Sequence, residues 1–332
     1  MRILITGGAG FIGSHLSDAF LSRGDEVAIV DDLSRGRQDR LSPEARLHKL
    51  SIADTQELST VVTEFNPELI CHLAAQIDVR DSITDPTRDA RINVVGTINV
   101  LTAARLVGAR VLFASSGGAL YGRDAPVPSP EDTPPMPESP YGIAKLCAEQ
   151  YINLYNRLYG TSHSVLRFAN VYGPGQAPSG EAGVIAVFCS SILAGKNPVV
   201  YGDGSQTRDY VYVGDVINAI LAAADHTRPC TWNIGTGTET SVLDLLAIIA
   251  DIAGYPVTPH HVSPRLGELQ RSAVKVERAA RDLDWRPGTV LRDGVRAVYR
   301  WIQSGAPDRQ PVAGGVGAAR QQSLHAAPTL QV

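Results

Sequence analysis

Cysteine is scarce in this chain, whose 332 residues include only Cys71, Cys147, Cys189 and Cys230, with no CxxC pair. This scarcity argues against a disulfide framework or a zinc site, and it favours a reducing compartment, the cytoplasm. A long hydrophobic run is also missing, because no apolar stretch approaches the roughly 20 residues that a membrane span needs. Residues 1–6 already read as a strand, so we expect no signal peptide before it.

The chain has no excess of positive charge. Lysine and arginine together number 30 against 34 acidic residues, which gives a formal net charge of −4. This balance argues against nucleic acid or an anionic membrane as the main partner, because both bind clustered cations. Hydrophobic residues make up 44% of the chain and charged residues 19%, so a large packed core is expected instead.

Short apolar runs alternate with helical segments through the first half of the chain. The expected strands are Arg2–Thr6, Glu26–Val30, Glu68–Ala74, Arg110–Ser115 and Ser164–Ala169, and the expected helices are Phe11–Ser22, Asp54–Glu64, Arg88–Val107 and Tyr141–Tyr159. Strands that alternate with helices in this order imply right-handed crossovers. The pattern therefore predicts an α/β fold, a Rossmann-type doubly wound parallel sheet.

The pattern loosens after residue 170. We expect a loop at 170–175, helices at Val184–Ala194, Ser241–Ala253 and Leu291–Gln303, a strand at Val199–Tyr201, and two strands that return to the sheet, Tyr210–Val213 and Trp232–Ile234. This predicts a first domain at 1–168, to which 209–236 returns, and a smaller interwoven domain at 169–306. Ligands are then expected in the cleft between the two. Residues 307–332 are rich in Gly, Ala, Gln and Pro, which is typical of a flexible tail.

A glycine-rich turn follows the first expected strand. Gly7, Gly10 and Gly13 have a GxxGxxG spacing, a variant of the fingerprint that brings a dinucleotide pyrophosphate to a helix N-terminus. Asp31 and Asp32 end the second strand about 20 residues on, where a carboxylate accepts the ribose hydroxyls of NAD. Arg35 and Arg37 follow closely and keep NADP open as an alternative, because a guanidinium group can bind the 2′-phosphate.

Tyr141 and Lys145 stand at i and i+4 on one helix face. A nearby ammonium favours the phenolate form of tyrosine, so this pair can act as a general base. Lysine is otherwise rare, with only three others in the chain. Upstream, Ser115 and Ser116 end an expected strand at the edge where a doubly wound sheet binds ligands.

Over roughly residues 1–305 the sequence resembles the extended short-chain dehydrogenases/reductases, and among them the NAD-dependent nucleotide-sugar epimerases typified by UDP-glucose 4-epimerase. The resemblance rests on these segments: 6–16 (TGGAGFIGSHL), 31–34 (DDLS), 72–76 (HLAAQ), 93–97 (NVVGT), 115–122 (SSGGALYG), 141–145 (YGIAK), 167–176 (RFANVYGPGQ) and 202–216 (GDGSQTRDYVYVGDV).

The resemblance implies 4-epimerisation of a UDP-sugar, with Tyr141 as base, Lys145 lowering its pKa, and Ser116 or else Ser115 binding the 4-hydroxyl. The implied NAD site consists of Gly7, Gly10, Phe11, Ile12, Gly13, Asp31, Asp32, Ser34, Gly36, Ser51, Ile52, Leu73, Ala74, Ala75, Gln76, Asn93, Tyr141 and Lys145. The implied UDP-sugar site consists of Ser116, Tyr141, Asn170, Val184, Tyr201, Arg208, Arg265 and Arg271. No metal site is implied. The resemblance also suggests a homodimer through the helices at 88–107 and 141–159.

Alternatives remain within and outside this family. Related dehydratases and decarboxylases carry acidic residues after the catalytic serine or threonine, whereas residues 117–120 here are GGAL, which favours simple epimerisation. A nucleotide-sugar reductase or dehydratase, or a catalytically silent dinucleotide sensor, would share the motifs. The sugar stays open between the glucose, N-acetylglucosamine and glucuronate series, although Ser272 matches a position where a bulky residue excludes N-acetyl sugars.

Overall fold

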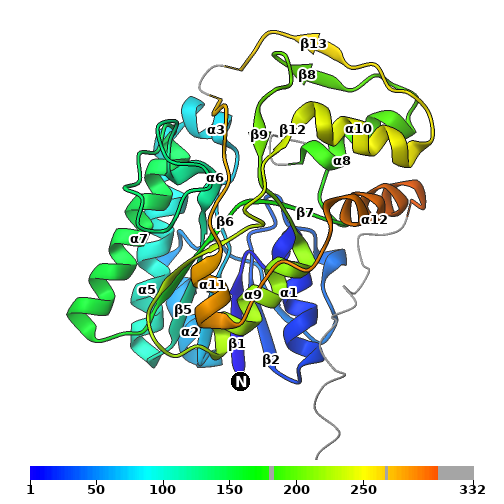
Figure 1. The fold of residues 1–332 in the computed structure, drawn as a ribbon. Helices are drawn as coiled ribbons and strands as arrows, with labels where there is room; N and C mark the ends of the chain where they lie inside the picture. The colour runs from blue at the N-terminus through cyan, green and yellow to red at the C-terminus, as the bar shows by residue number, and fades with distance from the viewer. Residues whose placement is uncertain (179–182, 266–267, 306–332) are drawn as a thin grey trace, which may run out of the picture.

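The computed structural model describes residues 1–178, 183–265 and 268–305, and its centre is one seven-stranded parallel sheet (Figure 1). The sheet strands are β1 Arg2–Thr6, β2 Glu26–Val30, β3 Arg46–His48, β4 Leu69–His72, β5 Arg110–Ser116, β6 Ser164–Phe168 and β11 Thr231–Ile234. Their order is β11-β6-β5-β4-β1-β2-β3, and every neighbouring pair is parallel. The expected doubly wound fold is confirmed, with its switch point between β1 and β4.

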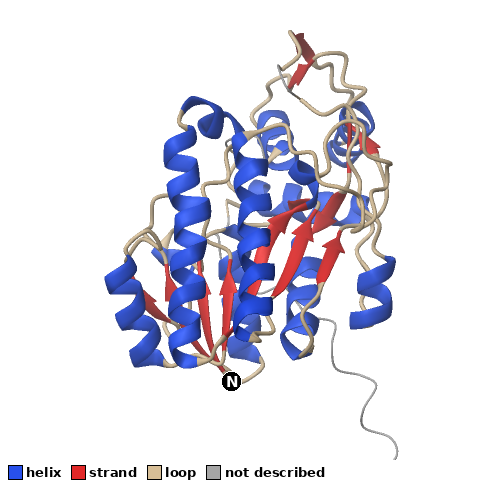
Figure 2. Ribbon diagram, turned by 90° about the vertical axis from the view of Figure 1, so that its left-hand side faces the viewer, coloured by secondary structure: helices blue, strands red, loops and turns tan. Residues whose placement is uncertain are grey.

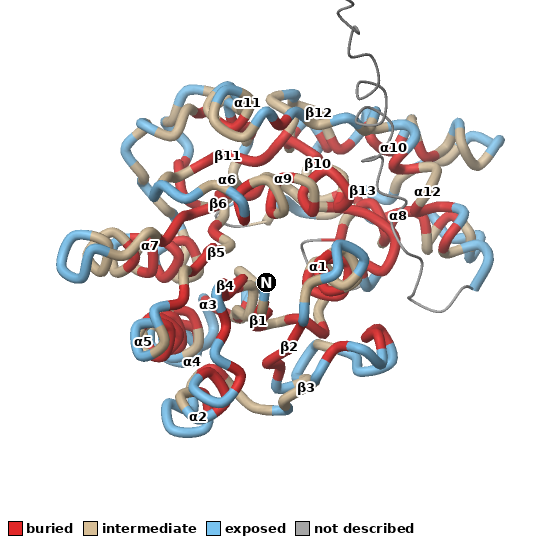
Figure 3. Tube along the Cα trace, turned by 90° about the horizontal axis from the view of Figure 1, so that it is seen from below, coloured by how far each residue is buried: buried red, intermediate tan, exposed pale blue. Residues whose placement is uncertain are grey.

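Helices cover both faces of this sheet (Figure 2). One face packs against α1 Phe11–Ser22, α9 Val213–Asp225 and α11 Glu277–Leu283, and the other against α2 Thr55–Phe65, α5 Gly96–Val107 and α7 Pro140–Tyr159. Side chains alternate between the two cores along each strand: in β1, Ile3 and Ile5 join the first core and Leu4 the second. Viewed from below, buried segments run through the sheet and the inner faces of the helices (Figure 3).

A third hydrophobic core lies above the carboxyl ends of the sheet strands (Figure 1). It is built mainly by α8 Val184–Leu193, α10 Val242–Ala253 and α12 Leu291–Gln303. Three two-stranded sheets belong to this part of the chain: β7 Asn170–Tyr172 with β10 Tyr210–Tyr212, β8 Val199–Tyr201 with β13 His260–Val262, and β9 Thr207–Arg208 with β12 Thr240–Ser241.

Several expectations from the sequence need correction. Residues 170–172, expected as a loop, form β7 and pair with β10, so the strand at Tyr210–Tyr212 lies outside the central sheet. Only Thr231–Ile234 returns to the sheet, beside β6. The helix expected at Arg88–Val107 is divided into α4 Pro86–Ala90, a π-helical turn at Arg91–Val95, and α5. The expected tail at 307–332 lies outside the described residues.

The sequence analysis also missed four helices. These are α9, α11, α3 Val79–Thr84 and α6 Gly117–Leu120. The latter two are too short to be stable alone, and both pack against α7. Over the described residues, no helix has the length and hydrophobicity needed to cross a membrane.

Candidate active site

The glycine turn after β1 is shaped by contacts that no side chain would allow. Gly7 has a φ of +72°, and a Cβ there would lie 2.6 Å from the backbone nitrogen of Ala74. A Cβ on Gly13 would lie 2.2 Å from the carbonyl oxygen of Gly7. These two glycines therefore let α1 and the chain after β4 pack directly against the turn.

The start of α1 fits a phosphate. Gly10 is its N-cap, and among the described residues no side chain caps the helix and no acidic residue lies in its first turn. A Cβ on Gly10 would meet only the Gly7 carbonyl, at 3.2 Å, so the space beyond it is open. The N–H groups at Phe11 and Ile12 lack intrahelical acceptors by position and suit an anion such as a pyrophosphate.

Asp31 sits at the end of β2 and is nearly buried. It accepts the backbone N–H groups of Ala9 (3.0 Å) and Leu33 (2.9 Å), one on each oxygen. Burial raises the pKa of this carboxyl group despite both hydrogen bonds. Each oxygen keeps a lone pair for a ribose hydroxyl, and Gly36 leaves the approach open, since a Cβ there would lie 2.6 Å from Asp31 Oδ1.

The charged residues that follow Asp31 are held by partners outside the proposed ribose site. Asp32 accepts the backbone N–H of Ser34 at 2.9 Å. Arg35 is paired with Asp81 at 3.0 Å, and Arg37 with Asp39 at 2.5 Å. Both guanidinium groups that could have accommodated a 2′-phosphate thus already have carboxylate partners, which favours NAD over NADP.

Asn93 fixes the chain that follows β4. Its Oδ1 accepts the backbone N–H of Gln76, and its Nδ2 donates to the Gln76 carbonyl, both at 2.9 Å. Leu73, Ala74 and Ala75 lie between this clamp and the glycine turn. Asn93 lies in the π-helical turn at 91–95. Such turns are frequent at functional sites.

Ser51 and Ile52 lie after β3 on the same side of the sheet. Ser51 Oγ accepts the N–H of Ala53 at 3.2 Å, and the carbonyl of Ile52 accepts Asn99 Nδ2 at 3.0 Å. The Ile52 side chain is buried against Gly96. These contacts hold the backbone of a segment that the resemblance assigns to the NAD site.

Tyr141, Ser116 and Lys145 come together where β5 meets α7. Ser139 caps α7 by accepting the N–H of Gly142 at 3.1 Å, which starts the helix one residue before Tyr141. The phenol of Tyr141 is hydrogen-bonded to Ser116. Lys145 Nζ donates to the carbonyl of Ala114 at 2.8 Å and lies 5.8 Å from the centroid of the Tyr141 ring.

Burial dominates the acid–base balance of Tyr141 and Lys145. Burial raises the pKa of Tyr141 to about 12, with Asp89 raising it further and the Ser116 hydrogen bond lowering it. Burial also lowers the pKa of Lys145 to about 8, against the opposite pull of Asp89 and Glu149. Burial is the largest influence on the pKa of Tyr141, and the lowering of that pKa by Lys145 stays a prediction.

Ser115 is directed away from this trio. Its hydroxyl donates to Glu149 Oε1 at 2.5 Å, and Glu149 in turn forms a buried salt bridge with Arg167, 2.6 Å long. Arg167 also donates to the hydroxyl of Tyr121, which donates to Asn233 Oδ1. Of the two candidate serines, Ser116 is thus the one beside Tyr141. The sequence analysis missed Glu149, although its position four residues after Lys145 places it on the same helix face.

A second buried hydrogen-bond network lies behind the chain that follows β4. Thr6 Oγ1 accepts the N–H of Ala74 (3.2 Å) and lies 2.7 Å from His72 Nδ1. Thr97 Oγ1 donates to the carbonyl of Asn93 (2.7 Å), so it accepts from His72 Nε2 (3.0 Å). His72 is therefore neutral with its proton on Nε2, and burial lowers its pKa to about 3.

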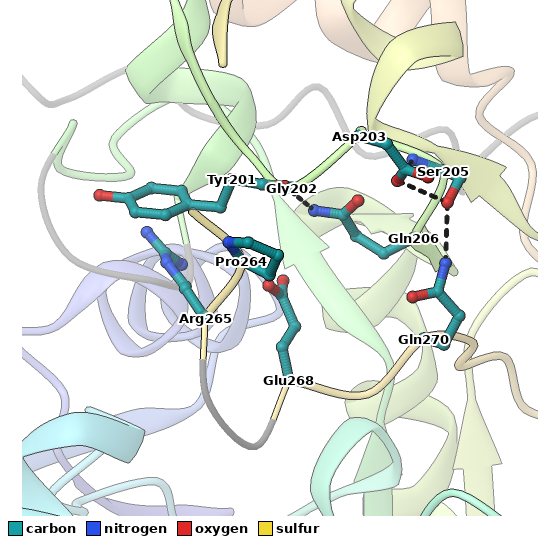
Figure 4. A pocket seen from close by; sticks show the side chains of 9 residues that line it. All are labelled: Tyr201, Gly202, Asp203, Ser205, Gln206, Pro264, Arg265, Glu268 and Gln270. Atoms are coloured by element: carbon teal, nitrogen blue, oxygen red, sulfur yellow. Dashed lines mark hydrogen bonds between the residues drawn. The ribbon is translucent and has the colours of Figure 1, made fainter. Parts of the chain in front are cut away.

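A pocket of about 530 Å³ lies in the upper part of the molecule, between β8 and the chain before and after residues 266–267 (Figure 4). The Arg265 guanidinium lies 3.7 Å from the Tyr201 ring centroid, and Arg80 of α3 approaches the same ring at 5.8 Å. These two cations lower the pKa of Tyr201. Arg80 thus brings a residue of the first half of the chain close to Tyr201.

The structure brings together only part of the expected arginine group. Arg208 donates to Glu268 Oε1 at 3.2 Å at the edge of the pocket. Arg271 instead pairs with Glu239 at 2.5 Å and is largely exposed. The sequence analysis missed both carboxylates, because these ion pairs join residues about 30 and 60 positions apart.

Asn170 and Ser272 both lie close to Gly118. A Cβ on Gly118 would lie 3.5 Å from Asn170 Oδ1 and 4.0 Å from Ser272 Oγ. A side chain in place of Gly118 would thus be in van der Waals contact with Asn170 and Ser272. Val184 is the first residue of α8 and follows its N-cap, Gly183. In the described residues, no cluster of His, Cys, Asp and Glu side chains suits a metal ion.

Comparison with known proteins gives concordant results. A model of the NAD-dependent epimerase/dehydratase family matches residues 3–235. The UDP-glucose 4-epimerase of Mycolicibacterium smegmatis is 46% identical over 311 residues, covering 92% of this chain and 99% of that protein. The solved UDP-glucose 4-epimerase of Thermotoga maritima, bound to UDP-glucose, superposes with a TM-score of 0.90 at 40% identity, over 92% of this chain and 99% of that one. The UDP-glucose 4-epimerase of Thermus thermophilus, in complex with NAD, gives 0.87 at 36% identity, over 92% and 100%.

Proposed function

Because the chain belongs to the NAD-dependent epimerase/dehydratase family, we propose that it catalyses the NAD-dependent 4-epimerisation of a UDP-sugar through a transient 4-keto intermediate. One observation carries the proposal. The phenol of Tyr141 meets Ser116 beside Lys145, at the carboxyl edge of the sheet that also carries the glycine turn.

In the proposed mechanism Tyr141 takes the proton of the sugar 4-hydroxyl while Ser116 holds the same oxygen by a hydrogen bond. NAD supplies the hydride acceptor and a positive charge that favours the phenolate. In the return half of the reaction Tyr141 gives its proton back to the 4-keto oxygen, after the sugar has presented its other face. Lys145, next to Tyr141 on α7, steadies the charge that builds on the phenol.

Turning the sugar requires that the nucleotide stays fixed. We assign this task to the pocket of Figure 4, where Tyr201 offers an aromatic face and Arg265 a cationic group. Arg208 binds the lining residue Glu268 at the edge of this pocket. Arg271 is assigned a lesser part, because it is engaged by Glu239. Asn170 and Val184 border the space between this pocket and Tyr141.

The dinucleotide site is proposed to span the glycine turn, Asp31, the Ser51–Ile52 segment and the Asn93 clamp. In this division, residues 1–168 together with the returning segment 209–236 bind NAD, and residues 169–306 bind the nucleotide sugar. The first two hydrophobic cores and β11 support the former part, and the third core supports the latter.

Epimerisation is favoured over dehydration by the segment after Ser116. Residues 117–120 form the short helix α6 and carry no acidic side chain for chemistry beyond carbon 4. Ser272 is small at the position where a bulky residue excludes N-acetyl sugars, which supports a pocket that accepts an N-acetyl group as well as a hydroxyl at carbon 2.

We further propose a homodimer located in the cytoplasm. An apolar stripe on α7, formed by Ile143, Cys147, Leu154 and Leu158, is partly or fully exposed, and Leu106 of α5 is exposed beside it. Two such surfaces from two chains would cover each other about a twofold axis. All four cysteines carry free thiols, in keeping with a reducing compartment.

The decisive experiment incubates the purified protein with UDP-glucose and with UDP-N-acetylglucosamine, without added cofactor. Appearance of the 4-epimer, together with NAD released on denaturing the protein, is the expected result. Tyr141→Phe is the matched control and should abolish conversion while keeping the bound NAD. Conversion that depends on adding NADH or NADPH would instead identify a reductase, and no conversion of any UDP-sugar would refute the enzymatic proposal.

A further inference from the structure

Asp89 is a buried carboxylate that the proposed mechanism has not used. It lies on α4, directly before the π-helical turn, and is only 1% exposed. Its Oδ1 accepts two hydrogen bonds, from Asn93 Nδ2 at 2.9 Å and from Gln76 Nε2 at 3.0 Å. Its Oδ2 is buried and has no hydrogen-bond partner among the described residues. An unpartnered buried carboxylate oxygen is destabilising, so its retention calls for a function.

Helix α4 packs against α7, and Ala144, the chain neighbour of Lys145, lines the same cavity as Asp89. Asp89 and Lys145 each shift the pKa of the other, and Asp89 also acts on Tyr141. The charge of this carboxylate therefore acts on both members of the tyrosine–lysine pair from outside helix α7.

The other ionisable groups around Lys145 do not replace Asp89. Glu149 lies one turn along α7, but its charge is matched by the buried guanidinium of Arg167. His72 of β4 is neutral, since burial lowers its pKa to about 3. The β5 strand offers only the carbonyl of Ala114. Among the described residues, Asp89 is thus the negatively charged neighbour of Lys145 that does not form a salt bridge with an arginine.

We propose that Asp89 is a positioning residue of the epimerase. Its Oδ1 fixes Asn93 and Gln76 at the dinucleotide site, and its charge is the counter-ion that Lys145 receives from outside α7. The inference rests on the proposed function, because it assigns Asn93 and Gln76 to the cofactor and Lys145 to the reaction. It also explains the orphaned Oδ2: a tighter partner there would neutralise the charge that acts on Lys145.

Asp89→Asn separates the two roles. The side chain keeps its shape and one oxygen for Asn93 and Gln76, but loses its charge. We expect bound NAD per chain to be unchanged. Without the carboxylate, both limbs of the pH profile of kcat/KM move to lower pH by about half a unit or more, the acid limb through Tyr141 and the alkaline limb through Lys145. Asp89→Ala removes the oxygen as well and should also reduce the bound NAD.

Asp85→Asn is the matched control. Asp85 caps the same helix by accepting the N–H of Arg88 at 2.9 Å, and asparagine caps equally well. This variant should keep the wild-type pH profile and NAD content.

The outcomes are distinct. If wild-type protein converts no UDP-sugar, the proposed function fails and the NAD content of Asp89→Ala still tests the positioning of Asn93 and Gln76. If the wild type is active and the limbs of Asp89→Asn stay in place, the counter-ion role is wrong. Failure of the isosteric Asp89→Asn to fold would also overturn the inference, because its hydrogen bonds are retained.

Discussion

At the scale of single residues, the two adjacent serines at the end of β5 have opposite surroundings. Ser116 is hydrogen-bonded to Tyr141, whereas the hydroxyl of Ser115 is committed to Glu149. Their order in the sequence cannot reveal this, because the pleat of a strand sends successive side chains to opposite faces.

We therefore predict different effects for two alanine variants. Ser116→Ala should lower kcat by on the order of 10²-fold with little change in Tm, because it removes a hydrogen bond to the reacting oxygen. Ser115→Ala should mainly lower stability, by about 1–3 kcal/mol, because it leaves a buried carboxylate with one fewer donor. Steady-state kinetics and thermal unfolding of both variants make the comparison, and a larger kcat loss in Ser115→Ala would reverse the assignment.

His72 predicts how stability depends on pH. Its pKa falls from 6.5 to about 3 on folding, so between these values the unfolded chain binds more protons than the folded one. Stability therefore drops as the pH falls below about 6.5, by about 2 kcal/mol at pH 5 from this residue alone. His72→Gln should lose that share of the pH dependence in urea unfolding at pH 7.5 and 5.0. His260→Gln, on the exposed strand β13, should behave like the wild type.

At the scale of secondary-structure elements, local patterns predicted what local forces decide. The β1 strand, the glycine turn and α1 were correctly predicted. The apolar run of the strand, the spacing of the glycines and the helical period of the apolar residues all lie within 22 residues. The pairing of β10 with β7 was not predicted, since it joins residues 40 apart and depends on which sheet edge is free. Asp89 was missed for the same reason: within its own helix it looks like a solvated carboxylate, and only Gln76 and Lys145 reveal its burial.

The junction of β1 and α1 gives the prediction at this scale. Gly13→Ala would place a Cβ 2.2 Å from the Gly7 carbonyl and 2.6 Å from Gly8 Cα, both backbone atoms. The helix must move away from the turn, so we expect a loss of about 1–3 kcal/mol in stability and a lower NAD content in the purified protein. Ser22→Ala, exposed near the other end of α1, is the control. A Gly13→Ala protein with full NAD occupancy would contradict the fit of α1 to the pyrophosphate.

At the scale of the whole molecule, the apolar stripe on α7 predicts the assembly. Ile143 is 54% exposed within this stripe. Ile143→Glu would bury a charge at each copy of the proposed interface, so we expect the molar mass from light scattering to fall from twice 35.4 kDa toward the single-chain value. Val290→Glu, at a similarly exposed residue outside the stripe, should leave the mass unchanged. A wild-type protein of single-chain mass would refute the homodimer.

The placement of β11 has a consequence for any attempt to divide the chain. Thr231–Ile234 pairs with the outer side of β6. The chain before α9, at Tyr210–Tyr212, and the chain after β11, from Val242, both help to build the upper part of the molecule. A fragment truncated at residue 168 would therefore end in an open edge strand with a row of unsatisfied peptide groups, a template for aggregation. We therefore expect that residues 1–168 do not fold as an autonomous unit, so that dissecting this protein calls for point substitutions rather than shortened versions.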